Sequence, residues 1–108
     1  MFCKNNTVEY RELLDGVRLQ TLVHGEKTLM GRFTLTKDAK IPPHRHPHEQ
    51  TGIMISGKML FTVDNIENEV EPGDSWCIPG GSEHSVIVLE DSVVVEVFSP
   101  YRADYLPR

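Results

Sequence analysis

The sequence predicts a single all-β domain, a sandwich or barrel whose interior is filled or holds a ligand. Stretches with strand-like composition recur along the chain, and turn residues close each one. No segment carries the 3.6-residue apolar periodicity of a helix over a convincing length. With 108 residues the chain has the size of one domain, so residues 1–108 are expected to fold as one unit around one core.

The expected strands follow one another from the N-terminus. Residues 9–14 are compatible with one helical turn or with a short strand and bend. VRLQTLV, at 17–23, alternates apolar and polar positions before HGEKT turns the chain. The later strand-like stretches are LMGRFTL, KDAKIPP, QTGIMISG, KMLFTV, IENEVEPGD, SWCIPGG, HSVIVLE and VVVEVF, with a turn at Asp64–Asn65. Short strands with regular turns are typical of β-sandwiches and barrels.

Composition excludes several classes of protein. Hydrophobic residues make up 39% and charged residues 25%, which is ordinary for a globular protein, and no long apolar run could cross a membrane. The net charge of -5 and the lack of a basic cluster argue against nucleic-acid binding. The N-terminus has no apolar signal core, and Cys3 and Cys77 give no disulfide framework. We therefore expect a cytoplasmic protein that binds neither nucleic acid nor a membrane.

The segment HRHPHEQ, at 44–50, contains three of the five histidines. Prolines within and before it exclude a helix, because each lacks an N–H donor and clashes with the preceding turn. In an extended chain side chains alternate, so one face would carry His44, His46, His48 and Gln50. Imidazoles two residues apart can reach one metal ion. A surface histidine tract with incidental metal affinity explains this segment equally well.

A second segment, GDSWCIPGGSEHSVIV, has the pattern of two short strands joined by a turn. Gly73 turns the chain into a strand, Pro79 to Gly81 fold it back, and His84 opens the returning strand. A lone histidine is usually structural, so His84 gains meaning only together with the first segment.

Together the two segments resemble the cupin superfamily, whose fold is a single-domain double-stranded β-helix, or jelly-roll barrel. The first motif, residues 44–57, has its family positions at His44, His46, Gln50 and Gly57. The second, residues 73–84, has them at Gly73, Pro79, Gly81 and His84. Two positions depart from the family pattern: Asp38 replaces a usual glycine, and Val88 replaces an asparagine that often ends the second motif.

The resemblance implies one divalent transition metal, with coordination positions left open to solvent or substrate. Its ligands would be His44, His46, Gln50 and His84. Three neutral imidazoles and an amide oxygen suit iron, nickel, zinc or manganese and are wrong for calcium. Gln50, where many cupins carry glutamate, leaves the metal charge less compensated and favours a Lewis acid. His48 and Met54 are expected to contact the substrate.

One branch of the superfamily resembles this chain more closely. HPHEQ and the ending VFSPYRADYL look like the small cupins of pectin and alginate breakdown, which open unsaturated uronate monosaccharides into linear keto-deoxyuronates. The resemblance implies an enzyme with Glu96, where the family has aspartate, as general base. It also implies that Phe98 stacks on the sugar and that Arg102 grips a carboxylate through its planar fork.

Several alternatives stay open at this point. Glu96 interrupts VVVEVF, and an edge strand could carry it outward as readily as a cavity could receive it. The protein could be a metal-dependent dioxygenase or isomerase for another small molecule, or a module that binds a sugar acid without turning it over. We also expect a homodimer, with a contact around residues 17–23, because VRLQTLV is long and lightly charged.

Overall fold

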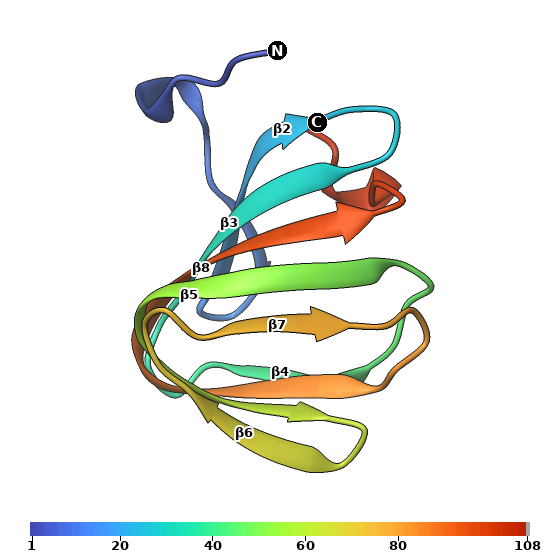
Figure 1. The fold of residues 1–108 in the computed structure, drawn as a ribbon. Helices are drawn as coiled ribbons and strands as arrows, with labels where there is room; N and C mark the ends of the chain where they lie inside the picture. Colours follow the sequence, from blue (N-terminus) through green and yellow to red (C-terminus); the bar gives the residue numbers. More distant parts are fainter. Residues whose placement is uncertain (108) are drawn as a thin grey trace.

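The computed structural model describes residues 1–107 and arranges their strands in two layers that curve around one interior (Figure 1). In chain order the elements are η1 (Asn5–Thr7), β1 (Arg11–Leu14), β2 (Val17–His24), β3 (Leu29–Leu35), β4 (Lys40–His44), β5 (Glu49–Val63), β6 (Ile66–Val70), β7 (Ser75–Ile78), β8 (His84–Ser99) and η2 (Ala103–Tyr105). Within this range η1 and η2 are single 3-10 turns. The all-β class predicted from the sequence is confirmed.

Two long strands, β5 and β8, connect the layers. They pair antiparallel from Glu49 opposite Ser99 to Val63 opposite His84. One layer continues through β3, β2 and β1, and the other contains β4 and β6. Figure 1 shows both long strands bending where the layers meet.

Two pairs of predicted strands are single long strands in the structure. QTGIMISG and KMLFTV together form β5, and HSVIVLE and VVVEVF together form β8. The register of the β5–β8 pair shifts around 54–59, and Gly57 has a positive φ of 92°. These irregularities bend the paired strands without ending them, as β-bulges do. Residues 9–14 resolve to the strand alternative, as β1.

The strand predicted to run through residues 44–50 is wrong in part. β4 ends at His44 and β5 begins at Glu49, so the intervening residues form a loop. β4 contains Pro42 and Pro43 and pairs only with β8 among the described strands, which is where a strand tolerates missing N–H donors.

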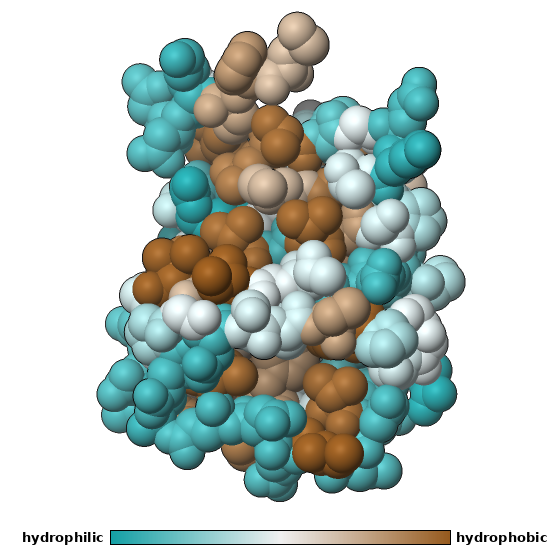
Figure 2. Space-filling view, viewed as in Figure 1, coloured by the Kyte–Doolittle hydropathy of each residue, from teal (hydrophilic) through white to brown (hydrophobic). Residues whose placement is uncertain are grey.

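The core fills the space between the layers. Alternate residues of β3 and β8 point inward, and Phe33, Val94 and Phe98 are almost fully buried there. On the outside, four of the five residues of β6 are exposed. Figure 2 shows polar side chains along much of the lower edge of this face, where β6 lies. No helix in residues 1–107 has the length and apolar character that crossing a membrane requires.

The expected dimer contact at 17–23 stays a prediction, but part of its argument fails. β2 is hydrogen-bonded to β3 along its length and to β1 only at Val17, Arg18 and Leu19, so among the described strands the rest of β2 keeps one open edge. Val17 and Leu19, which made this stretch look apolar, are 1% exposed and belong to the core.

Three glycine-to-alanine variants should separate backbone strain from steric clash. At Gly25 a Cβ meets nothing within 4 Å, so Gly25→Ala should leave stability unchanged. Gly73 has φ +93° and equally open surroundings, so Gly73→Ala should cost roughly 1–2 kcal/mol of strain. At Gly57 a Cβ would also lie 2.3 Å from the Asp91 carbonyl oxygen. Gly57→Ala should therefore lower the free energy of unfolding, measured in urea, by roughly 3 kcal/mol or more. If Gly73→Ala and Gly57→Ala lower it equally, the steric clash at Gly57 is not significant.

Candidate metal centre and cavity

Three histidines from different parts of the chain meet at one end of the interior. His44 ends β4 and pairs across the sheet with His84, the first residue of β8, while His46 lies in the loop before β5. One ring nitrogen from each lies within 4.8 Å of the others. Three imidazoles at this spacing could hold one metal ion.

The hydrogen bonds of these histidines fix which ring nitrogen is free. Nδ1 of His44 lies 2.9 Å from the Pro42 carbonyl oxygen, and Nδ1 of His84 lies 2.9 Å from that of Ser82. Because a carbonyl can only accept, each Nδ1 carries the proton and each Nε2 keeps its lone pair. Backbone carbonyls orient metal-binding histidines in this way.

Three acceptor atoms in and beside the cluster lack a donor among the described residues: His84 Nε2, His46 Nε2 and Gln50 Oε1. His84 Nε2 is buried and has no hydrogen-bond partner among residues 1–107. His46 donates through Nδ1 to the His48 carbonyl oxygen at 3.0 Å, so its Nε2 presents a lone pair to Gln50 Oε1, another acceptor, at 3.0 Å. Buried acceptors without donors are costly, and a cation bound among them satisfies all of them. The residues present therefore fit a metal ion.

The same environment keeps the histidines ready to bind a metal. The pKa of His84 is lowered to about 4, mainly by burial; the hydrogen bond to the Ser82 carbonyl opposes the shift, and the neighbouring imidazoles and Arg102 add to it. Burial is also the main cause that lowers the pKa of His46. Both rings are therefore neutral near pH 7, which metal ligation requires.

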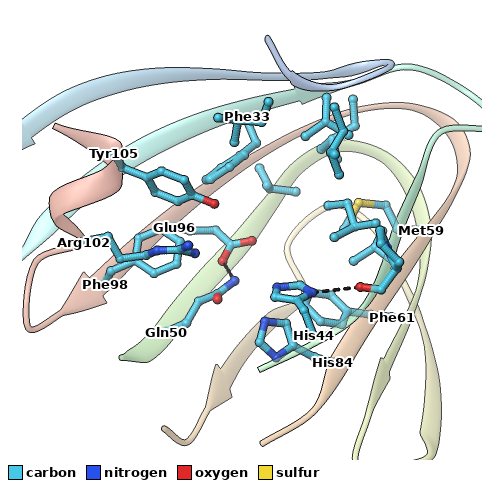
Figure 3. A pocket seen from close by; sticks show the side chains of 18 residues that line it. Phe33, His44, Gln50, Met59, Phe61, His84, Glu96, Phe98, Arg102 and Tyr105 are labelled. Carbon is cyan, nitrogen blue, oxygen red and sulfur yellow. Dashed lines mark hydrogen bonds between the residues drawn. The ribbon is translucent and has the colours of Figure 1, made fainter. Parts of the chain in front are cut away.

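Gln50 links this cluster to Glu96. Gln50 begins the buried part of β5, and its Nε2 donates a hydrogen bond to Glu96 Oε2. The bond directs the amide oxygen toward the histidines, where a metal ligand has to point. Figure 3 shows this pair on the same side of the cavity as Tyr105, with His44 and His84 on the other side.

A cavity of about 310 Å³ lies beside the histidines, between the layers. Its wall is mostly apolar, and the polar side chains on it are few. Those on the wall with titratable or amide groups are His44, Gln50, His84, Glu96, Arg102 and Tyr105. An apolar cavity with a few convergent polar groups is the usual form of a small-molecule site.

Glu96 faces this cavity together with Phe98. β8 is hydrogen-bonded on both sides, to β3 and to β5, so the alternative of an exposed edge strand does not hold. Glu96 is 6% exposed and Phe98 is 1% exposed. Burial raises the pKa of Glu96 to about 8, and the nearby charge of Arg102 opposes the shift only in part. A carboxyl with a pKa near neutrality is suited to proton transfer.

Arg102 reaches the cavity from the end of the chain. Its guanidinium lies over the Tyr105 ring, 3.9 Å from the centroid, and 5.3 Å from that of Phe98. Asp104 binds two of its nitrogens, Nε at 3.2 Å and Nη2 at 2.7 Å. Among the described residues its third nitrogen, Nη1, has no hydrogen-bond partner, and Arg102 lines the cavity.

These features agree with the comparisons with known proteins. Residues 31–100 match the Cupin domain family. This chain is a cupin. It is 28% identical to the pectin degradation protein KdgF of Dickeya dadantii (strain 3937), over 99 residues that cover 90% of each chain. The resemblance inferred from the two motifs is confirmed.

Solved structures give the same picture of this cupin. KdgF from Halomonas sp. matches it with a TM-score of 0.93 and 26% identity, over 98% of both chains. An RmlC-like cupin from Shewanella frigidimarina also reaches a TM-score of 0.93, at 23% identity over 97% of this chain and 95% of the other. At that identity the second match shows a shared fold.

Two residues expected to contact substrate lie away from the cavity wall of this cupin. His48 is in the loop before β5, its ring centroid 5.5 Å from that of His46, and it is not among the lining residues. Met54 is 1% exposed in the core and does not line the cavity either. Their substrate contacts stay predictions without geometric support. Conversely, Tyr105 lines the cavity and was not predicted, because its position in ADYL carries no signal that separates it from surface residues.

Metal content should depend on the histidine cluster. We expect the parent to bind about one zinc ion per chain, and His84→Ala to bind it more than about tenfold more weakly. His24→Ala, which removes an exposed histidine at the end of β2, is the control and should match the parent. Calorimetric titration of metal-stripped protein measures both.

The bound ion should also be released as the pH falls, since protonated imidazole cannot coordinate. Equal affinity in His84→Ala and the parent would contradict the assignment.

Proposed function

We propose that this cupin is a metal-dependent enzyme that opens 4,5-unsaturated uronate monosaccharides to their linear keto forms. One observation carries the proposal: His44 and His84 of the histidine cluster line one cavity together with Glu96, Phe98 and Arg102, and this cavity is large enough for a monosaccharide. The similarity to KdgF, a pectin degradation protein, supports this substrate class.

The polar groups of the cavity match the parts of such a substrate. A uronate carries one carboxylate, and Nη1 of Arg102 is free to bind it while Asp104 holds the rest of the guanidinium. The Phe98 ring, on the same side as Arg102, offers an apolar surface for the sugar ring. The substrate oxygens would then face the histidine cluster.

The proposed reaction is an isomerisation and needs no oxidant or reductant. The anomeric hydroxyl loses its proton, the bond between the anomeric carbon and the ring oxygen breaks, and an aldehyde forms. The ring oxygen keeps the electron pair as an enol, which becomes a ketone when carbon 4 accepts a proton. Glu96 would take and return this proton, since its carboxyl titrates near neutrality in a water-poor cavity.

A metal ion held by His44, His46, Gln50 and His84 would supply a fixed positive charge that polarises the substrate oxygens. These donors suit a divalent transition metal, and iron, nickel, zinc and manganese all remain compatible with them. Apart from Arg102, no cationic side chain lines the cavity among the described residues.

Substitution of the acid should separate catalysis from binding. Metal-loaded Glu96→Gln should lose roughly 10²–10⁴-fold in turnover with little change in KM, because the amide cannot carry the proton. Arg102→Lys should instead raise KM about tenfold, since lysine keeps the charge without the planar fork. Loss of the vinyl proton of unsaturated galacturonate, followed by NMR, measures both after subtraction of the spontaneous rate.

Glu67→Gln and Arg18→Ala, which change exposed residues of β6 and β2, serve as controls. A Glu96→Gln enzyme as fast as the parent removes the proton-transfer role. A parent no faster than buffer rejects the enzyme and favours a module that binds a sugar acid.

We further propose a cytoplasmic homodimer. β5 exposes Ile53 and Ile55 to 41% and 53% on its outer side, and exposed isoleucines of this kind favour an interface between copies. Light scattering at micromolar concentration should give twice the chain mass, and Ile55→Asp should halve it. A parent with the mass of one chain contradicts the dimer.

A further inference from the structure

Tyr105 occupies the cavity wall opposite the histidine cluster. It belongs to the 3-10 turn η2, and its hydroxyl points into the cavity (Figure 3). The cavity wall is largely apolar, with Leu13, Val17 and Phe33 among its residues, and Glu96 is the polar side chain beside the hydroxyl (Figure 3). A phenol hydroxyl in such surroundings normally has a hydrogen-bond partner, because a buried polar group without one is costly.

The ring of Tyr105 is held firmly from several sides. It packs edge-on against Phe98 at 5.4 Å and against Phe33 at 6.0 Å, between ring centroids. The Arg102 guanidinium lies on its face at 3.9 Å. These contacts leave the ring little freedom, so the hydroxyl has a fixed position in the cavity before any ligand enters.

The backbone of the turn is also fixed. The Tyr105 N–H donates to the Arg102 carbonyl oxygen at 3.0 Å, and Thr21 Oγ1 donates to the Tyr105 carbonyl oxygen. Arg11 of β1 donates to the carbonyl oxygens of Asp104 at 2.8 Å and Leu106 at 3.2 Å. Among residues 1–107 the hydrogen bonds of Tyr105 thus run through its backbone, and its hydroxyl points into the cavity beside Glu96 (Figure 3).

We propose that Tyr105 is a substrate-binding residue whose hydroxyl donates a hydrogen bond to a sugar oxygen on the side away from the histidine cluster. The inference rests on the proposed function and adds to it a contact that distinguishes a hydroxylated sugar acid from an apolar acid of similar size. Burial raises the pKa of Tyr105, so the phenol stays protonated and able to donate near pH 7. A fixed donor loses little entropy on binding, which is where preorganised groups contribute most.

The test is Tyr105→Phe, which removes one oxygen and keeps the ring that packs on Phe98, Phe33 and Arg102. Binding of saturated galacturonate to the zinc-loaded protein is measured by calorimetry, because this sugar lacks the reactive double bond. One neutral hydrogen bond corresponds to roughly threefold to tenfold weaker binding. Tyr101→Phe, at a tyrosine that is 38% exposed and does not line the cavity, is the matched control and should bind as the parent does.

The outcomes separate this inference from the proposed function. If the parent binds galacturonate and Tyr105→Phe binds it equally well, the role of Tyr105 is overturned while the uronate function stands. If Tyr101→Phe weakens binding as much, the effect is not specific to the cavity and the role is overturned as well. If the parent neither binds galacturonate nor turns over its unsaturated form, the proposed function fails and the inference fails with it.

Discussion

The pairing of β5 with β8 is the constraint on which the rest of the structure depends. Each of these strands crosses from one layer to the other, so residues far apart on one strand face each other across the interior. His84, at the start of β8, joins the histidine cluster in one layer, and Glu96 and Phe98 occupy the other layer. Gln50 lies opposite Phe98 in the register and completes the connection. A flat sheet would place these groups some 12 residues apart along a strand, beyond reach of one small ligand.

Burial acts on the two kinds of titratable group in opposite directions, and both shifts suit the site. Removing water disfavours any charge, so burial lowers the pKa of His84 and raises that of Glu96. Neutral imidazoles are able to bind a metal, and a carboxyl that holds its proton near neutrality is able to exchange it. Burial in one cavity therefore shifts the pKa values of both groups, and Arg102 is the charged side chain that acts on Glu96.

The C-terminal turn completes the cavity through contacts with the N-terminal strands. Arg11 and Thr21 hold the backbone of residues 104–106 with hydrogen bonds from β1 and β2. Asp104 in turn holds Arg102, whose guanidinium stacks on Tyr105. The first and last parts of the chain thus build one wall together: β1 and β2 contribute apolar side chains such as Leu13 and Val17 and also hold the turn that carries Tyr105.

The sequence by itself determined the all-β class and, through the cupin resemblance, identified the three histidines that the structure brings together. Prolines excluded a helix at 42–47, and two spaced motifs brought His44, His46, Gln50 and His84 into one hypothesis. Only the tertiary structure decided that Glu96 faces inward, since a strand pattern is the same whether its strand lies at an edge or in the centre. For the same reason only the structure showed that Met54 lies in the core and that Tyr105 lines the cavity. Whether a side chain faces the core, the cavity or solvent depends on neighbours that are distant in sequence, and a local sequence pattern does not contain them.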